Sequence, residues 1–533
     1  MNELLILAAF STPLLLIPFV WSDRRRVLPV VAAVPALLVG LLVPEGTVVS
    51  VPWLLLGVHL QLDSIGAMLL PASAFIWLAA ALWSRLRSPD SLDAAGFRAF
   101  FLAAMGGNLL VILAADMISF YIGFALMGLA AYPLLLRRSQ QARFGARVYL
   151  VLTLVGELAL FAAMVGLYVN SGSLLLSDIA QAPFQCVSVA LLLIAFGIKV
   201  ALPGLHVWLP MVYNVAPIVT VAVLSGPMMK AGLVGWLRFL PIGQEGMAFW
   251  GELLFVLGVI GVLLGVVFGS LQRRPQAVLG YSSIAKMGLI SAMIGLALAE
   301  PARAEPIVLA VMLFALHHLL VKSALFLGIG EWQRVGATRP VMILLGVLAL
   351  SLAAAPLTGG AAAKFALKDA IGVDVAWLLT VSAIGTGLLM IRFMLLVRAC
   401  PEKPRQVSPE PWFWWILLPV AALGPFLPWQ LAWKLDGIGP LLLSVPLALA
   451  AWWIGQRYPG LPWRVPPGDV LRWASRLHQP QPSASGRNRQ SWHPQVIWYE
   501  LISSTPAAIN LLVPGLLLLL LAAGLLGTLL LPS

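Results

Sequence analysis

Residues 191–240, LLLIAFGIKVALPGLHVWLPMVYNVAPIVTVAVLSGPMMKAGLVGWLRFL, decide the fold of this chain. The first apolar run carries Lys199 near its middle and breaks at Pro203 and Gly204. The second apolar run holds Lys230. Lysines at bilayer depth are costly unless water or a carboxylate meets them, and a helix breaks inside a membrane only where protein or a wet cavity satisfies its backbone. The stretch therefore predicts part of an ion path.

The composition of the whole chain agrees with this interpretation. Of its 533 residues, 61% are hydrophobic and 10% are charged, which excludes an ordinary soluble globule. The net charge of +12 comes from arginines in short loops between apolar runs, so it indicates membrane topology and not a nucleic-acid partner. Cys186 and Cys400 are too far apart to indicate a disulfide framework or a metal cluster.

Apolar runs of membrane-spanning length recur along the sequence and predict an all-α polytopic membrane protein with about 16 transmembrane helices, two of them broken. The predicted spans run near 4–21, 28–43, 64–84, 97–114, 117–136, 148–168, 187–218 with a break after 203, 221–240, 249–270, 277–298, 307–329, 341–371 with a break, 375–397, 411–430, 438–456 and 506–531.

Loop charges predict the orientation of these spans. Loops 44–63 and 169–186 contain no Lys or Arg, whereas the loops between them in the alternation carry most of the arginines. We therefore expect a bacterial-type inner membrane protein with both termini on the outer side. The first apolar run has neither a basic n-region nor a cleavage site, so we expect it to be a retained helix.

A second broken helix is predicted at 350–372, LSLAAAPLTGGAAAKFALKDAIG. Pro356 and the Gly359–Gly360 pair interrupt it, and Lys364 and Lys368 follow the break. Matched interrupted helices in two halves are typical of inverted repeats around an ion path.

Several other ionisable residues lie inside predicted spans. His318 and Lys322 are four residues apart and share one helix face, which places a titratable group beside a switchable charge. Glu157 is the carboxylate in the middle of the first half and hence the expected counter-ion of Lys199. For each buried lysine and for Glu157 the alternative is a structural hydrogen bond to a neighbouring helix. The secondary candidates are His206, Lys286, His317, Lys368 and Arg392.

Two of these candidates have more specific expectations. Lys364 is the expected end of the path and Lys368 its aqueous exit, whereas Arg392 is expected to be structural because a guanidinium hardly deprotonates. The sequence has no phosphate-binding glycine loop, GxSxG elbow, CxxC pair or paired-carboxylate site. We therefore expect no cofactor, no metal and no catalysis by this chain alone.

Five segments resemble the antiporter-like subunits of respiratory complex I, a family that includes the large Mrp cation/proton antiporter subunits and group 4 hydrogenase membrane subunits. They are FGIKVALPGLHVWLP, APIVTVAVLSGPMMKAGLVGWLRF, QAVLGYSSIAKMGLI, HHLLVKSALFLGIG and PLTGGAAAKFALK. The second segment is most similar to the Mrp D and hydrogenase-4 B branch. The resemblance covers roughly residues 60–400 and implies two inverted five-helix repeats.

The expected organisation follows from the repeats. We expect N-terminal helices at 1–96, the repeats at 97–240 and 249–397, further helices at 398–456, a basic cytoplasmic segment at 457–505 and a last helix at 506–533. The resemblance implies that Lys199, Lys230, the His318/Lys322 pair and Lys364 are the proton-carrying residues of the seventh, eighth, eleventh and twelfth helices.

The fifth helix departs from the family pattern. Family members carry a Trp-Glu pair there, and this chain has Phe124 and Ala125. Lys286 likewise stands where Gln or His is usual. Either Glu157 has replaced the missing carboxylate, or the subunit no longer conducts.

The resemblance implies a subunit that moves protons, or a coupled cation such as Na+, within a larger complex of integral membrane subunits in the lipid bilayer. Such a complex can be an oxidoreductase, similar to NADH:quinone oxidoreductase or hydrogenase. Two alternatives remain open: the proton-driven subunit of a two-component inorganic-carbon uptake system, and a non-conducting structural spacer.

Overall fold

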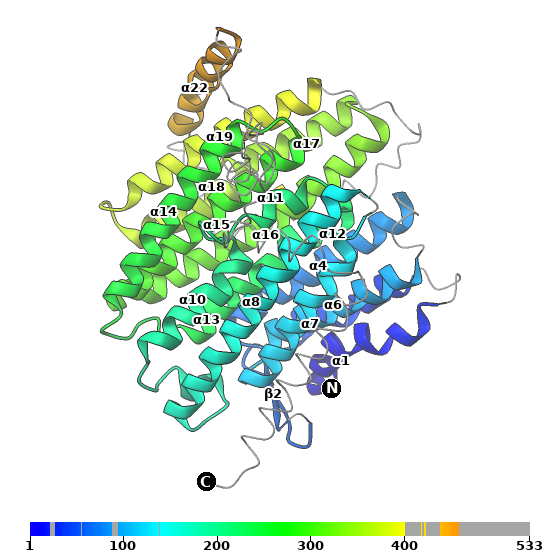
Figure 1. The fold of residues 1–533 in the computed structure, drawn as a ribbon, viewed down its shortest axis with the longest axis vertical. Coiled ribbons are helices and arrows are strands. Elements are labelled where there is room, and N and C mark those ends of the chain that lie inside the picture. Colours follow the sequence, from blue (N-terminus) through cyan, green and yellow to red (C-terminus); the bar gives the residue numbers. More distant parts are fainter. Residues whose placement is uncertain are drawn as a thin grey trace, which may run out of the picture.

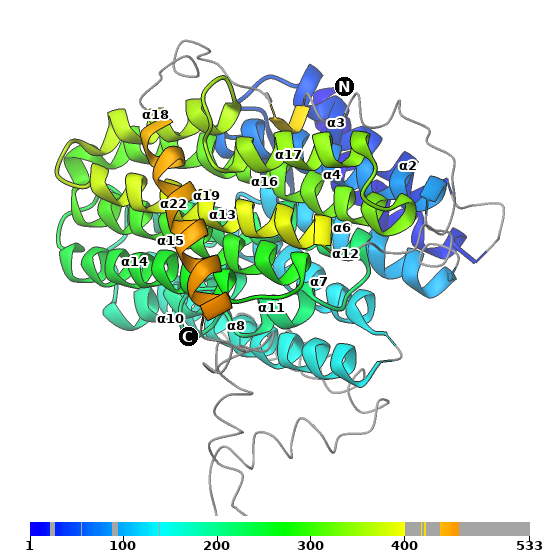
Figure 2. The same cartoon turned by 90° about the horizontal axis from the view of Figure 1, so that it is seen from above.

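The computed structural model describes residues 1–21, 27–54, 56–87, 94–137, 139–399, 417, 420–422 and 438–457. Figure 1 shows most helices running side by side in one direction, and Figure 2 shows the same bundle turned by 90°. The predicted span at 506–531, most of the one at 411–430 and nearly all of the basic segment at 457–505 lie outside the described residues.

Helices form almost all of the regular structure in this part of the chain. The first half contains α1 (Asn2–Leu15), η1 (Ile17–Phe19), α2 (Leu28–Ala32), α3 (Val34–Leu42), α4 (Ser64–Arg87), α6 (Ala95–Leu113), α7 (Met117–Leu135), α8 (Gln140–Ser171), α9 (Leu176–Ile179), α10 (Cys186–Val200), α11 (Trp208–Tyr213), α12 (Ile218–Val223), η3 (Leu224–Met228) and α13 (Met229–Phe239). The second half contains α14 (Ala248–Ser270), α15 (Pro275–Ala299), η4 (Pro301–Arg303), α16 (Ala304–Val335), α17 (Arg339–Leu352), α18 (Gly359–Ile371), α19 (Ala376–Ala399) and α22 (Ile438–Arg457).

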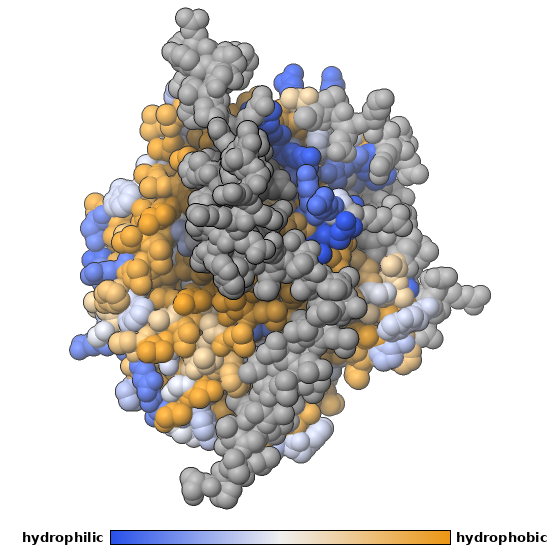
Figure 3. All heavy atoms as spheres, viewed as in Figure 1, coloured by the Kyte–Doolittle hydropathy of each residue, from blue (hydrophilic) through white to orange (hydrophobic). Residues whose placement is uncertain are grey.

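Ten helices of the described part are long and apolar enough to cross a membrane, and four shorter apolar helices accompany them. The prediction of an all-α polytopic membrane protein is thereby confirmed, while the total of about 16 spans stays a prediction. Apolar side chains cover much of the face drawn in Figure 3, and hydrophilic ones gather toward its edges. This distribution suits a bundle surrounded by lipid.

One small sheet interrupts the helical pattern. The strands β1 (Val48–Val51) and β2 (Val58–Gln61) form an antiparallel hairpin within the stretch expected to be an outer loop. Asp116 fastens this hairpin to α7, because one carboxylate oxygen accepts from the Ser119 N–H at 2.7 Å and the other from the His59 N–H at 2.8 Å. Asp116 is therefore both a helix cap and a tie to the hairpin.

Arg238 fastens the end of α6 to the start of α4. Its guanidinium donates to the carbonyls of Val111, Ile112 and Ala114 and to the Asp63 carboxylate, which lies 2.9 Å away. These carbonyls belong to the last turn of α6, where a helix leaves its acceptors unsatisfied. Arg238 thus stabilises the rim of the bundle around the site.

Both predicted broken helices are present, although the breaks begin earlier than their prolines. After α10, Ala201 and Gly204 have positive φ of 61° and 87°. After α17, Ala354 and Leu357 have positive φ of 60° and 64°. Each lysine-bearing helix therefore ends in left-handed residues that turn the chain inside the bundle.

The Gly359–Gly360 pair, expected to break the helix, instead opens α18. Thr358 caps this helix by accepting from the Ala361 N–H. A Cβ on Gly360 would overlap the carbonyl oxygen of Ser351 and would lie 3.1 Å from the His317 ring. Glycine is needed there because α17, α18 and α16 meet at this point.

The predicted single helix at 221–240 is wrong in one detail. A π-helical turn, η3, separates α12 from α13 just before Lys230. Pro227 lies in this turn and has no N–H to continue the helical ladder. The hydroxyls of Ser225 and Ser323 both donate to the Ala222 carbonyl beside it, at 3.2 and 2.8 Å.

Candidate functional site

The first cluster of ionisable side chains surrounds Lys199 at the end of α10. Lys199 is buried, and its Nζ donates to the Tyr149 hydroxyl at 3.1 Å. Nζ also lies 5.4 Å from the centroid of the Phe124 ring and 5.1 Å from that of the Tyr149 ring. Two aromatic faces and a hydroxyl therefore hold this cation. Phe124 is one of the two residues that replace the usual Trp-Glu pair.

Glu157 lies on α8 and is 3% exposed. Its Oε1 accepts no hydrogen bond from any residue that the structure describes. A Cβ placed on Gly128 of α7 would lie 2.8 Å from this Oε1 and 3.1 Å from Lys199 Nζ. The carboxylate and the ammonium therefore border the same small space beside Gly128, without a direct hydrogen bond between Oε1 and Nζ.

A second contact joins the two halves of the chain. Lys230 of α13 and His318 of α16 are both buried, and Lys230 Nζ lies 2.8 Å from His318 Nδ1. An ammonium at this distance donates to a neutral imidazole, and a neutral amine accepts from it, so the pair can share one proton.

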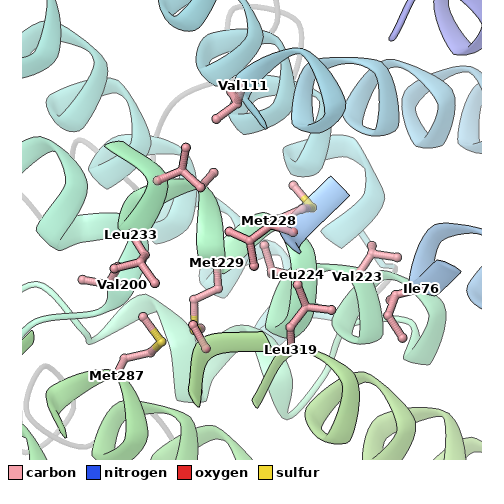
Figure 4. Packing of buried hydrophobic residues seen from close by; sticks show 14 of the residues in the cluster. Ile76, Val111, Val200, Val223, Leu224, Met228, Met229, Leu233, Met287 and Leu319 are labelled. Atoms are coloured by element: carbon pink, nitrogen blue, oxygen red, sulfur yellow. The ribbon is translucent and has the colours of Figure 1, made fainter. Parts of the chain in front are cut away.

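Around this contact the packing is apolar. Figure 4 shows side chains of η3, α13, α15 and α16 grouped around Lys230, among them Leu224, Met229, Met287 and Leu319. All four are buried. Such a lining excludes bulk water and leaves the polar groups as the places where a proton can reside.

Lys322 lies one turn beyond His318 on α16. It donates to the Leu279 carbonyl at 2.8 Å and to the Ser282 hydroxyl, both on α15. Lys286 follows one turn after Ser282, with its Nζ 5.3 Å from the centroid of the Phe314 ring. Both lysines are buried, and they are close enough to interact electrostatically.

The second broken helix approaches this cluster from the other side. His317 Nε2 lies 2.9 Å from the Ser351 hydroxyl at the end of α17, and Ser351 donates to the Ala422 carbonyl. Lys364 is buried in α18 and lies within electrostatic reach of Lys286, whereas Lys368 is exposed. Exposure of Lys368 is compatible with the expected aqueous exit.

His206 and Arg392 lie apart from these contacts. His206 is buried in the first break, and neither of its ring nitrogens has a hydrogen-bond partner among the described residues. Arg392 donates to the Gln272 carbonyl through two of its nitrogens, at 3.2 and 3.0 Å. This contact ties α19 to the end of α14 and is the structural role expected for a guanidinium.

Some members of the clusters were missed from the sequence. They are the neutral residues Gly128, Tyr149, Thr153, Ser282 and Ser351. The polar stripe of Tyr149, Thr153 and Glu157, each four residues apart in an apolar helix, could have been found by its helical spacing. Across the described ranges, no three His, Cys, Asp or Glu side chains come together as metal ligands.

Comparison with known proteins gives one consistent answer. The family described as NADH:quinone oxidoreductase/Mrp antiporter, transmembrane, matches residues 114–389. The chain is 27% identical over 362 residues to NADH-quinone oxidoreductase subunit N of Desulforudis audaxviator, covering 65% of this chain and 70% of that protein. It is 28% identical over 331 residues to hydrogenase-4 component B of Escherichia coli, covering 56% of this chain and 49% of that protein. The chain thus spans about half the length of that second relative.

Solved structures share the fold. A chain of the Mrp complex from Dietzia sp. superposes with a TM-score of 0.74 at 22% identity, covering all of this chain and 63% of that one. A chain of respiratory complex I from Thermus thermophilus gives a TM-score of 0.68 at 21% identity, covering 84% of this chain and all of that one.

Proposed function

Because this chain belongs to the NADH:quinone oxidoreductase/Mrp antiporter transmembrane family, we propose that it translocates protons, or a cation coupled to them, as one membrane subunit of a larger complex. Its partners are other integral membrane subunits, and they or an existing ion gradient supply the energy. The two halves, 97–240 and 249–397, act as inverted repeats in a bacterial inner membrane, with both termini outside.

The observation that carries this proposal is the 2.8 Å contact between Lys230 and His318. It joins α13 of the first half to α16 of the second through side chains that each bind and release a proton. Buried ionisable residues persist in membrane spans at high cost, so a contact of two such groups across the halves supports a proton path.

In the proposed path, protons enter from the cytoplasmic side near Lys230. They move along Lys199, Lys230, His318 and Lys322 and leave at Lys364. Neighbouring bases in a water-poor interior repel one another's protons, so a proton arriving at one site promotes release from the next. Lys286, placed among Lys322, Lys364 and His317, takes part in this exchange.

Glu157 takes the place of the missing fifth-helix carboxylate in this proposal. It is buried, and it borders the same space as Lys199. A carboxylate at this place favours the charged lysine and can accept its proton. Glu157 therefore sets the charge state of Lys199 at one end of the path.

The test uses the intact complex, purified in mild detergent and reconstituted into vesicles that contain a pH-sensitive dye. We expect Lys199→Ala and Lys322→Ala to assemble normally and to lose proton movement, by about a hundredfold. Arg398→Ala is the control, because it removes one exposed positive charge from the end of α19. Normal proton movement by both lysine variants would refute the proposed function and favour the spacer alternative. The subunit masses of the purified complex identify its partners.

A further inference from the structure

A polar stripe on α8 faces the Lys199 site. Tyr149, Thr153 and Glu157 are spaced four residues apart, so they lie one above the other on one face of the helix. All three are buried. This face meets Gly128 of α7 and Lys199 of α10, which makes the stripe part of the first cluster.

Two polar atoms of this stripe have no hydrogen-bond partner among the described residues. They are Thr153 Oγ1 and Glu157 Oε1, and both side chains are at least 97% buried. Buried oxygens without a partner are rare because each costs free energy comparable to a lost hydrogen bond. In folded proteins such atoms are usually satisfied by a bound water that has two to four polar neighbours.

Gly128 determines where that water can lie. The position of a Cβ on Gly128 is 2.8 Å from Glu157 Oε1, 2.9 Å from Thr153 Cγ2 and 3.1 Å from Lys199 Nζ. An oxygen at this place would therefore be within hydrogen-bond distance of both the acid and the lysine. Any residue with a Cβ would fill it.

We propose that Gly128, Thr153, Glu157 and Lys199 form a binding site for one ordered water that carries the proton between Lys199 and Glu157. The inference rests on the proposed function. In the forward step the Lys199 ammonium gives a proton to the water, and the water gives one of its protons to the Glu157 carboxylate. A neutral amine and a neutral carboxyl group result, the water is regenerated, and the total charge is unchanged.

Tyr149 is the positioning residue of this site. Its hydroxyl donates to the Gly128 carbonyl at 3.2 Å and accepts from Lys199 at 3.1 Å. The single hydroxyl proton is committed to the carbonyl, so a lone pair faces the lysine. This arrangement keeps Lys199 Nζ beside Gly128 and leaves its other protons free to reach the water.

The test measures proton movement by the reconstituted complex. Gly128→Ala places a methyl group in the water site and is expected to lower the rate about tenfold or more. Gly145→Ala, on α8, is the matched control, because its new Cβ would meet only Met211 atoms at 3.6 Å. The double variant Gly128→Ala/Glu157→Asp is expected to recover most of the rate, since the shorter acid withdraws from the methyl group and restores room for the water.

A second variant keeps the inference testable if Gly128→Ala fails to assemble. Thr153→Val preserves shape and removes only the hydroxyl, and we expect a loss of about fivefold that Thr153→Ser reverses. Wild-type rates in Thr153→Val, or no recovery in an assembled Gly128→Ala/Glu157→Asp complex, would overturn the water site. Wild-type rates in Lys199→Ala would instead overturn the proposed function itself, so the two failures are distinguishable.

Discussion

The helices α8 and α16 hold the same place in the two halves of the molecule, yet they present opposite chemistry. Each is 32 residues long and precedes a broken helix that carries a lysine. The inner face of α8 carries an acid, Glu157, with two hydroxyls. The inner face of α16 carries three bases, His317, His318 and Lys322.

The difference also extends to the broken helices. Lys199 lies in the last turn of α10, where the helix dipole favours a cation, and Glu157 lies beside it. Lys364 lies in the first half of α18, toward the end where the dipole opposes a cation. One half thus favours a charged lysine, while the other gathers bases that repel one another's protons. The Lys230–His318 contact joins these two environments.

The largest effect is expected from removing the acid that distinguishes α8. Glu157→Gln keeps the shape of the side chain but cannot accept a proton, so we expect proton movement to fall about a hundredfold with assembly intact. Dye quenching in vesicles measures the rate, and native gel electrophoresis measures assembly. Ala125→Glu, which puts an acid one turn before Gly128, should be tolerated and should restore part of the rate to Glu157→Gln. An unchanged rate in Glu157→Gln would mean that the two halves do not differ in function.

Adding an acid to the second half should make it resemble the first. Ser282→Asp places a carboxylate where the Ser282 hydroxyl now accepts from Lys322. A fixed ion pair would hold Lys322 charged, and we expect proton movement to fall about tenfold. Ser282→Asn is the matched control, because it keeps a neutral acceptor of similar size. Equal rates in Asp and Asn variants would show that the charge of Lys322 does not change during transport.

Much of this contrast could be predicted from the sequence. The apolar runs predicted the membrane helices, and Lys199, Lys230, Lys322 and Lys364 within them predicted where the polar interior lies, because an ionisable residue in a span must face the bundle interior. Prolines and glycines predicted both breaks.

The remaining features depend on packing that no local pattern reveals. Tyr149 reaches Lys199 only because α8 packs on α10, and Gly128 matters only because α7 joins them. The breaks begin at Ala201 and Ala354, residues with no left-handed preference of their own, so tertiary packing holds them there. The carboxylate missing from the fifth helix was visible at Ala125, but its replacement needed three-dimensional distances.

A smaller effect should separate the halves by stability. Lys286→Met removes one of the crowded bases of the second half, and we expect the free energy of unfolding to stay equal or to rise by about 1 kcal/mol. Lys199→Met leaves Glu157 buried without its cation, and we expect a loss of about 2–3 kcal/mol. Thermal denaturation of the purified complex in detergent checks both. A loss in Lys286→Met as large as in Lys199→Met would mean that the second half contains a counter-charge of equal strength.

The smallest effect concerns the backbone of the two breaks. Gly204 has a φ of 87° with open space around its Cβ position, so Gly204→Ala adds only backbone strain and should cost about 1 kcal/mol. Leu357 has a φ of 64° and is 52% exposed, so Leu357→Gly relieves strain with little loss of packing and should be neutral or stabilising by up to about 1 kcal/mol. The same denaturation experiment measures the two variants side by side. Opposite signs are expected because the first break has a glycine at a left-handed position where the second has a leucine. A clear loss of stability in Leu357→Gly would show instead that the leucine side chain anchors the second break.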